Sequence, residues 1–192
     1  MRVGPAGRGI RGFPTFRAGL ECAVMKQTQE FCVLLAKEDF KFSAAHFTLF
    51  PDGSSELLHG HNYQVAVELC GETLDEYGLL CDFAALKVEI RRLCAGLDSR
   101  TLIPSLSAEL EVRSEGDSVE VGYRERLYRI PLQDVLLLEL ENTSIELMAV
   151  MLWQDLAPRL QESRVTRLGI SVAETAGQSC WYRAAIPASP PS

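Results

Sequence analysis

The sequence of 192 residues lacks long apolar runs, and none approaches the roughly 20 residues that a membrane-spanning helix needs. It also lacks an excess of basic residues, because 19 Lys and Arg stand against 26 Asp and Glu, for a formal net charge of −7. A negative charge of this size argues against a nucleic-acid partner. We therefore expect one domain of a cytoplasmic protein that binds neither nucleic acid nor a membrane.

The cysteines lack the close pairing of a CxxC motif, although the sequence contains six of them. They are Cys22, Cys32, Cys70, Cys81, Cys94 and Cys180. We also expect no signal peptide at the start of the sequence. The cysteines are therefore interpreted as reduced thiols, mostly buried, with Cys70 and Cys81 assigned to the core.

Residues 1–28 lack hydrophobic periodicity and contain no serine, although they carry several arginines. A transit peptide is rich in serine as well as arginine, so this interpretation is not favoured. We expect a disordered or spurious extension over 1–28, a folded domain over 29–186 and a loose tail over 187–192.

Histidine is scarce as well, but its three copies, His46, His59 and His61, lie within sixteen residues. Side chains alternate between the faces of a strand, so His59 and His61 point the same way, and Gly60 keeps the opposite face clear. A hairpin that folds the strand of His46 alongside brings the third ring to the same point. Three imidazoles with an open fourth position are typical of a catalytic zinc site, so Zn²⁺ is the predicted cofactor.

The periodicity of the remaining sequence predicts both strands and helices. Period-two patterns predict strands at 31–35, 40–47, 61–70, 165–174 and 179–184, and a hairpin with a following strand over 109–131. Helical spacing predicts one helix from Asp82 to a left-handed Gly96, and a second that begins with a capping box over 143–146. An apolar run at 135–140 leads into the second helix. This order favours an α+β fold, with an antiparallel sheet and two helices on one face.

Several short motifs together resemble the 6-pyruvoyltetrahydropterin synthase family, which includes the 6-carboxytetrahydropterin synthases of the queuosine pathway. The resemblance covers roughly residues 30–184 and depends on the order and spacing of the motifs. They are Phe42-Ser43-Ala44-Ala45-His46, Leu58-His59-Gly60-His61-Asn62-Tyr63, Asp82-Phe83, Leu97-Asp98, Thr143-Ser144-Ile145-Glu146 and Val172-Ala173-Glu174-Thr175.

The resemblance implies a tunnel fold: a four-stranded antiparallel sheet with two helices, here with the hairpin over 109–131 as an insertion, whose copies form barrels as trimers or hexamers. It implies zinc on the three histidines and a reduced pterin substrate, 7,8-dihydroneopterin triphosphate or a relative. It implies that Glu174 binds the N–H groups of the pterin ring, which suits a carboxylate at the end of an apolar strand. The segment of Thr143, Ser144 and Glu146 is implied to border the pterin.

The sequence departs from the family at the groups that transfer protons. The family uses a cysteine thiolate and an Asp-His couple, but Ser55 stands at the expected cysteine and Ser99 at the histidine expected after Asp98. A serine hydroxyl is a far poorer base than a thiol with a pKa of about 8.5. Glu56, three residues before His59, instead fits the pattern Glu-x-x-His-Gly-His. Some family members are thought to use this glutamate to cleave dihydroneopterin to 6-hydroxymethyl-dihydropterin.

Four functions therefore stay open at this point. The first is a lyase with altered acid–base groups, for which Glu56 is the candidate. The second is a weak form of the usual synthase, in which zinc does most of the work beside Ser55, Asp98 and Ser99. The third is an inactive pterin-binding homologue. The fourth is a zinc hydrolase with Glu56 or Asp98 as its base, which the other motifs do not support.

Overall fold

The computed structural model describes residues 29–187, so the predictions for 1–28 and for most of the tail lie outside the described residues. Within this range the helices are α1 (Phe83–Leu97) and α2 (Ile145–Leu156), with short 3₁₀ helices at Leu132–Asp134 and Ala157–Leu160. The strands are β1 (Phe31–Leu35), β2 (Lys41–His46), β3 (His59–Gly71), β4 (Arg100–Pro104), β5 (Glu111–Glu115), β6 (Ser118–Tyr123), β7 (Arg126–Pro131), β8 (Val135–Leu138), β9 (Arg167–Thr175) and β10 (Gln178–Ala185).

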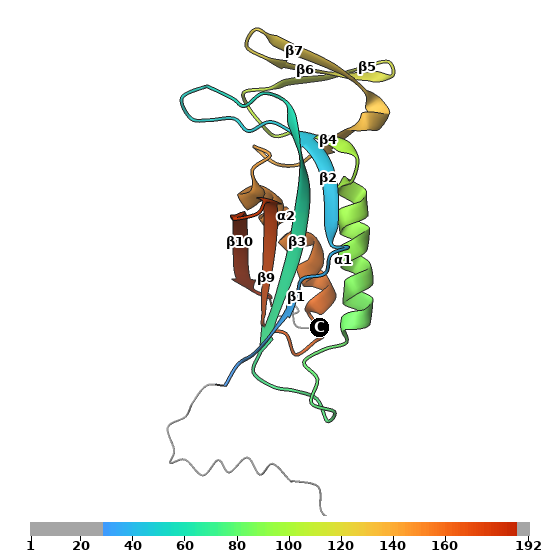
Figure 1. Ribbon diagram of the computed structural model, residues 1–192, viewed down its shortest axis with the longest axis vertical. Helices are drawn as coiled ribbons and strands as arrows, with labels where there is room; N and C mark the ends of the chain where they lie inside the picture. The colour runs from blue at the N-terminus through green and yellow to red at the C-terminus, as the bar shows by residue number, and fades with distance from the viewer. Residues whose placement is uncertain (1–28, 188–192) are drawn as a thin grey trace, which may run out of the picture.

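Seven strands form the main sheet, in the order β10-β9-β3-β2-β4-β8, with β1 also pairing with β3 (Figure 1). The pairs of β3 with β1, β2 and β9, and the pair of β9 with β10, are antiparallel. Strand β4 runs parallel to both β2 and β8. The main sheet is therefore mixed, with seven strands in place of the expected four antiparallel ones. Buried and exposed residues do not alternate along β4 or along the four residues of β8, so neither strand has a period-two pattern.

Strand β3 shows how the main sheet buries one face. Tyr63, Val65, Val67 and Leu69 are buried, as the alternation predicts. Residues of both α1 and α2 share one hydrophobic cluster with these side chains, so both helices cover the same face (Figure 1). A register slip of one residue would turn this apolar set towards solvent, so the core fixes the register of β3.

Helix α1 begins where the sequence predicts and ends slightly later. The Asp82 side chain caps it by accepting a hydrogen bond from the N–H of Ala84. The predicted left-handed cap at Gly96 is wrong, because the helix continues to Leu97 and it is Ser99 that adopts a positive φ of 59°.

Helix α2 is capped by a different residue of the predicted capping box. The N-cap is Ser144, whose hydroxyl accepts a hydrogen bond from the N–H of Leu147. The hydroxyl of Thr143 instead donates to the carbonyl of Phe47. The predicted pairing of Thr143 with Glu146 is therefore wrong, since a long-range contact takes the threonine away from the helix.

The predicted hairpin over 109–131 is a separate antiparallel sheet of three strands, β5-β6-β7, which we call the inserted sheet. It lies at one end of the molecule, beyond the ends of both helices (Figure 1). Its buried Val119 and Val121 belong to a second hydrophobic cluster, which also includes Phe47, Leu49 and Leu58. The latter three come from residues 47–58, which join β2 to β3 and are called the connecting segment below. The inserted sheet thus packs on the segment that leads into the histidines.

A disulfide joins Cys32 on β1 to Cys70 on β3, at directly opposite positions of the two strands. The prediction of reduced thiols is therefore wrong for this pair, whose separation of 38 residues gives no pairing signal in the sequence. Burial raises the pKa of the Cys94 thiol to about 11. The other cysteines that the structure describes are free: Cys81, Cys94 and Cys180.

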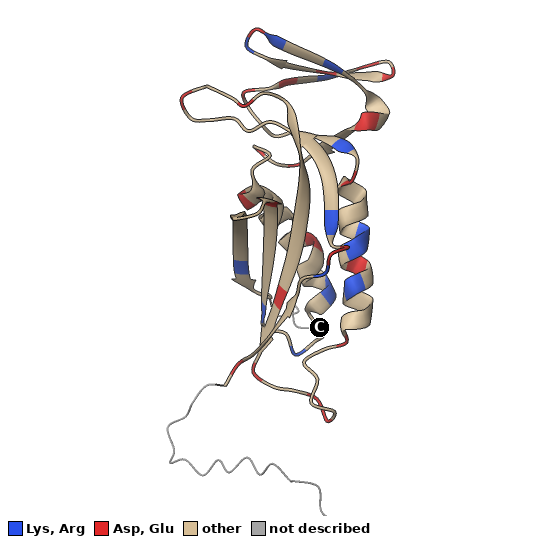
Figure 2. Cartoon of the chain, viewed as in Figure 1, with Lys and Arg blue, Asp and Glu red and all other residues tan. Residues whose placement is uncertain are grey.

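Charged residues of both signs are interspersed along the chain. Lys and Arg occur on α1, on β10 and in the inserted sheet, with Asp and Glu near them and in the loops (Figure 2). Among residues 29–187, no helix has both the length and the apolar character needed to cross a membrane.

Candidate metal centre

The three histidine rings converge at one end of the main sheet. His46 on β2 lies directly opposite His59 on β3, and His61 follows two residues later on the same face. The ring centroids are 4.7–5.3 Å apart, and one nitrogen of each ring lies within 4.8 Å of the others. Strand pairing and period-two alternation produce this cluster, so the predicted convergence of the rings is confirmed.

Backbone carbonyls fix which nitrogen carries the proton in two of the rings. The Nδ1 atom of His46 lies 3.0 Å from the carbonyl of Thr143, and that of His59 lies 2.7 Å from the carbonyl of Leu57. A carbonyl oxygen only accepts, so both Nδ1 atoms donate and each Nε2 of the neutral ring keeps a lone pair. Burial lowers the pKa of His46, which favours its neutral form. The Nε2 atom of His59 lies 2.8 Å from that of His61.

These nitrogens fit a zinc ion. The Nε2 atom of His46 is buried and has no hydrogen-bond partner among residues 29–187. It lies 3.6 Å from Oε1 of Glu174, which is also an acceptor when ionised. An unsatisfied buried acceptor costs about 1–3 kcal/mol, and a cation at this point removes that cost. Three neutral imidazoles are also a ligand set of catalytic zinc, so the chemistry of the residues agrees with the predicted cofactor.

Glu174, the predicted pterin ligand, lies near the end of β9 beside the histidines. Its side chain is only 10% exposed, and burial raises the pKa of its carboxyl group. Its Oε2 atom accepts a hydrogen bond of 2.9 Å from the side chain of Gln178, whereas Oε1 faces His46. The structure therefore brings Glu174 together with the histidines and leaves one of its oxygens directed at them.

Thr143 orients the ring of His46 through a hydrogen bond with its Nδ1 atom. Its carbonyl receives the Nδ1–H of His46, and its buried hydroxyl donates to the carbonyl of Phe47 at 2.9 Å. Asn142, which the sequence reasoning missed, both accepts from and donates to the backbone of Leu49. These contacts tie the start of α2 to the connecting segment, and no sequence pattern signals the role of Asn142.

Ser144 and Glu146 border the same region from the first turn of α2. Ser144 is engaged as the helix cap, whereas Glu146 is exposed. The charge of Glu146 adds to burial in raising the pKa of Glu174. Ser144 and Glu146 thus follow directly on Thr143, whose carbonyl contacts His46.

Glu56 holds an ionised carboxylate close to the histidines. Its Oε2 atom accepts from the N–H of Thr48 at 2.9 Å, and its own N–H donates to the carbonyl of Thr48 at 3.0 Å. Burial alone raises the pKa of Glu56, but hydrogen bonding to Thr48 and the neighbouring His59 and His46 lower it overall. The structure thus brings Glu56 to the metal centre, as the pattern Glu-x-x-His-Gly-His indicates.

Ser55 is the neighbour of Glu56, but its hydroxyl is engaged elsewhere. It accepts a hydrogen bond of 2.9 Å from Nη1 of Arg126 on β7 and donates to the carbonyl of Glu56 at 3.2 Å. Sequence reasoning missed Arg126, which lies 71 residues away in the chain and in no motif.

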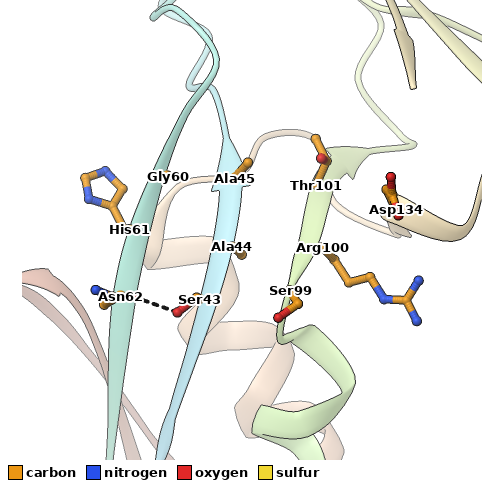
Figure 3. A pocket seen from close by; sticks show the side chains of 10 residues that line it. All are labelled: Ser43, Ala44, Ala45, Gly60, His61, Asn62, Ser99, Arg100, Thr101 and Asp134. Carbon is orange, nitrogen blue, oxygen red and sulfur yellow. Dashed lines mark hydrogen bonds between the residues drawn. The ribbon is translucent and has the colours of Figure 1, made fainter. Parts of the chain in front are cut away.

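Asp98 and Ser99 make their contacts away from the histidine rings of the same chain. Oδ1 of Asp98 accepts from the N–H of Ser43 at 2.7 Å, and the N–H of Ser99 donates to the carbonyl of Ser43 at 2.7 Å. The hydroxyl of Ser43 donates a hydrogen bond of 2.6 Å to Oδ1 of Asn62. Both side chains lie on the face of the sheet opposite the histidine rings. Ser43, Asn62 and Ser99 line a cavity of about 430 Å³. His61 also borders this cavity, but its ring extends from β3 on the side away from Ser99 (Figure 3).

The protein thus has a mixed sheet with three histidines on one face, and the carboxylates of Glu56 and Glu174 lie near them. The family profile described as 6-pyruvoyl tetrahydropterin synthase matches residues 35–185. A protein of Methanocaldococcus jannaschii is 30% identical over 146 residues, which cover 74% of this chain and 89% of that protein. Its name gives 6-carboxy-5,6,7,8-tetrahydropterin synthase as a provisional assignment.

Solved structures agree with the sequence comparison. The chain superposes on 6-pyruvoyl tetrahydropterin synthase of Plasmodium vivax with a TM-score of 0.77 at 27% identity, covering 82% of this chain and 99% of that one. A second structure of the P. vivax protein is described as a catalytic-residue mutant, in which a glutamate is replaced by alanine. This chain therefore belongs to the 6-pyruvoyl tetrahydropterin synthase family.

Proposed function

We propose that this protein is a zinc-dependent lyase that acts on 7,8-dihydroneopterin triphosphate or a related dihydropterin, with Glu56 as its acid–base group. The observation that carries the proposal is the Glu56 carboxylate, held by the N–H of Thr48, near three imidazoles whose nitrogens lie within 4.8 Å of one another. His46, His59 and His61 would hold the metal ion.

We assign each residue a role in this reaction. When bound, zinc supplies Lewis acidity that polarises the oxygens of the substrate side chain. Glu174 accepts hydrogen bonds from the N–H groups of the pterin ring and so orients the side chain towards the histidines. Glu56 accepts a proton from the side chain and returns it to the product. The carbonyl of Thr143 keeps the Nε2 lone pair of His46 available.

Two further observations favour Glu56 over Ser55 as the group that transfers protons. The hydroxyl of Ser55 is held by Arg126 and by a backbone carbonyl, whereas Glu56 is already ionised. In addition, the similar P. vivax protein has a glutamate that is described as catalytic. The same observations support a second function, the cleavage of dihydroneopterin to 6-hydroxymethyl-dihydropterin.

Mass analysis of the products distinguishes these functions. Zinc-loaded protein is incubated with 7,8-dihydroneopterin triphosphate and, separately, with dihydroneopterin. We expect 6-pyruvoyl- or 6-carboxytetrahydropterin from the first substrate if the synthase reaction is retained. Release of 6-hydroxymethyl-dihydropterin identifies the second function. Complete recovery of both substrates from zinc-loaded protein contradicts a lyase and leaves an inactive pterin-binding homologue.

We also propose that copies of the chain associate into trimers or hexamers through their sheet edges. In the described residues β10 pairs only with β9, so its outer edge offers free backbone groups to another copy. Asp98 and Ser99 are turned away from the histidines of their own chain, so a catalytic role for them requires a neighbouring copy. Analytical ultracentrifugation tests this proposal, which a purely monomeric species contradicts.

A further inference from the structure

The inserted sheet holds the connecting segment through polar side chains as well as through the second hydrophobic cluster. Nη1 of Arg126, at the start of β7, donates to the hydroxyl of Ser55 at 2.9 Å and to the carbonyl of Glu56 at 2.8 Å. The hydroxyl of Tyr123, at the end of β6, donates to the carbonyl of Gly53 at 2.6 Å. Both donors come from one tight hairpin, so a single structural unit holds three nearby positions of the segment.

These contacts complete the anchoring of the Glu56 backbone. Its carbonyl is held by Arg126, and its N–H is held by the carbonyl of Thr48. The Glu56 carboxylate in turn accepts from the N–H of Thr48. The position of the carboxylate is therefore set from two sides, by Thr48, two residues beyond the end of β2, and by the inserted sheet.

We infer that Arg126 is a positioning residue for Glu56, and that the inserted sheet serves to hold the acid–base segment against the metal centre. This inference rests on the proposed function of Glu56. Arg126 contacts the Glu56 carbonyl and the Ser55 hydroxyl, so its effect on the reaction passes through the placement of Glu56. Arg126 is partly buried, and its guanidinium carries a full positive charge. Hydrogen bonds from a charged donor are stronger than those from a neutral one.

The size of the effect follows from the sensitivity of proton transfer to geometry. A displacement of about 1 Å at a reacting group can cost about 100-fold in rate. Replacing Arg126 by alanine frees the backbone of Glu56 on one side only, because Thr48 still holds the other side. We therefore expect Arg126→Ala to lower kcat by about 10- to 100-fold, with KM changed by less than about threefold.

The matched control is Arg129→Ala, on the same strand. Arg129 is exposed and its nitrogens come no closer than 3.8 Å to the carboxylates of Glu115 and Glu120, so we expect kcat to stay within about twofold. Both variants should retain zinc. Hydrogen exchange gives a readout independent of activity, since only Arg126→Ala should speed exchange at the amides of Thr48 and Glu56. Arg126→Lys, which keeps the charge and can reach one acceptor, should recover part of kcat and shows that the loss is not one of folding.

A double-mutant cycle with Glu56→Gln decides whether Arg126 acts through Glu56. We expect Arg126→Ala to have no further effect on kcat once Glu56 has been replaced. Equal losses in both backgrounds, or wild-type kcat in Arg126→Ala, overturn the inference. Full activity of Glu56→Gln overturns the proposed function of Glu56 itself and the positioning role with it. Loss of activity in Glu56→Gln with normal kcat in Arg126→Ala contradicts the positioning role alone.

Discussion

The main sheet and the inserted sheet contribute to the site in different ways. In the main sheet, the register between β2 and β3 places the histidines, and the same register buries the core beneath both helices. In the inserted sheet, a smaller hydrophobic cluster and two side-chain donors hold the connecting segment that carries Glu56. The main sheet thus holds the proposed metal ligands and the inserted sheet holds the proposed acid–base residue, with the carbonyl of Leu57 as a contact from the connecting segment to His59. Changes in either sheet should therefore affect mainly one of the two proposed roles.

The largest effect is expected from removing a metal ligand. His59→Ala leaves two imidazoles at the centre, so zinc should fall from about one ion per chain to near none, and turnover should be lost. Metal analysis after gel filtration measures this. The control is Asn62→Ala, on the opposite face of β3, which should retain zinc. Full zinc content in His59→Ala would place the metal elsewhere.

Glu56→Gln should separate metal binding from proton transfer most clearly. The amide keeps the size of the side chain but cannot accept a proton, so turnover should fall about 10²- to 10⁴-fold. Zinc should remain at the wild-type level, because the three histidines are held by the main sheet. Steady-state kinetics and metal analysis on the same preparation check this, with the exposed Glu38→Gln as control. A parallel loss of zinc and turnover would remove the distinction between the two parts.

A change inside the second hydrophobic cluster should weaken the inserted sheet. Leu110, just before β5, is buried in this cluster, and Leu110→Ala should lower the free energy of unfolding by about 2 kcal/mol. Because the connecting segment packs on the same cluster, turnover should fall more than zinc content. Urea denaturation and metal analysis measure the two effects. Zinc loss as severe as in His59→Ala would mean that the two sheets are not independent.

The smallest effect is expected at Tyr63, where the core of the main sheet meets the histidines. Its ring stacks on Phe42 at 4.7 Å, but its buried hydroxyl has no hydrogen-bond partner among residues 29–187. Tyr63→Phe keeps the stacking and removes the unsatisfied group, so metal-free protein should gain about 1 kcal/mol of unfolding free energy. Thermal unfolding measures this gain, and a loss of stability would show that the hydroxyl has a partner.

The sequence predicts the features that depend on local pattern. The alternation from Tyr63 to Leu69 predicts the buried face of β3, and the spacing of the histidines predicts their convergence. Features that depend on pairing between distant segments could not be predicted. The parallel strands β4 and β8 lack alternation of buried and exposed residues, and nothing in the spacing of Cys32 and Cys70 signals their disulfide. Hydrogen bonds such as those of Arg126 to the connecting segment depend on the packing of the inserted sheet, which no motif encodes.

X-ray absorption at the zinc edge tests most directly whether the three imidazoles share one ion. For zinc-loaded protein, we expect a first shell with three imidazole nitrogens at about 2.0–2.1 Å. We also expect this shell to be lost in His46→Ala. A sulfur ligand at about 2.3 Å, or an unchanged nitrogen shell in His46→Ala, would contradict the binding of one zinc ion by the three imidazoles.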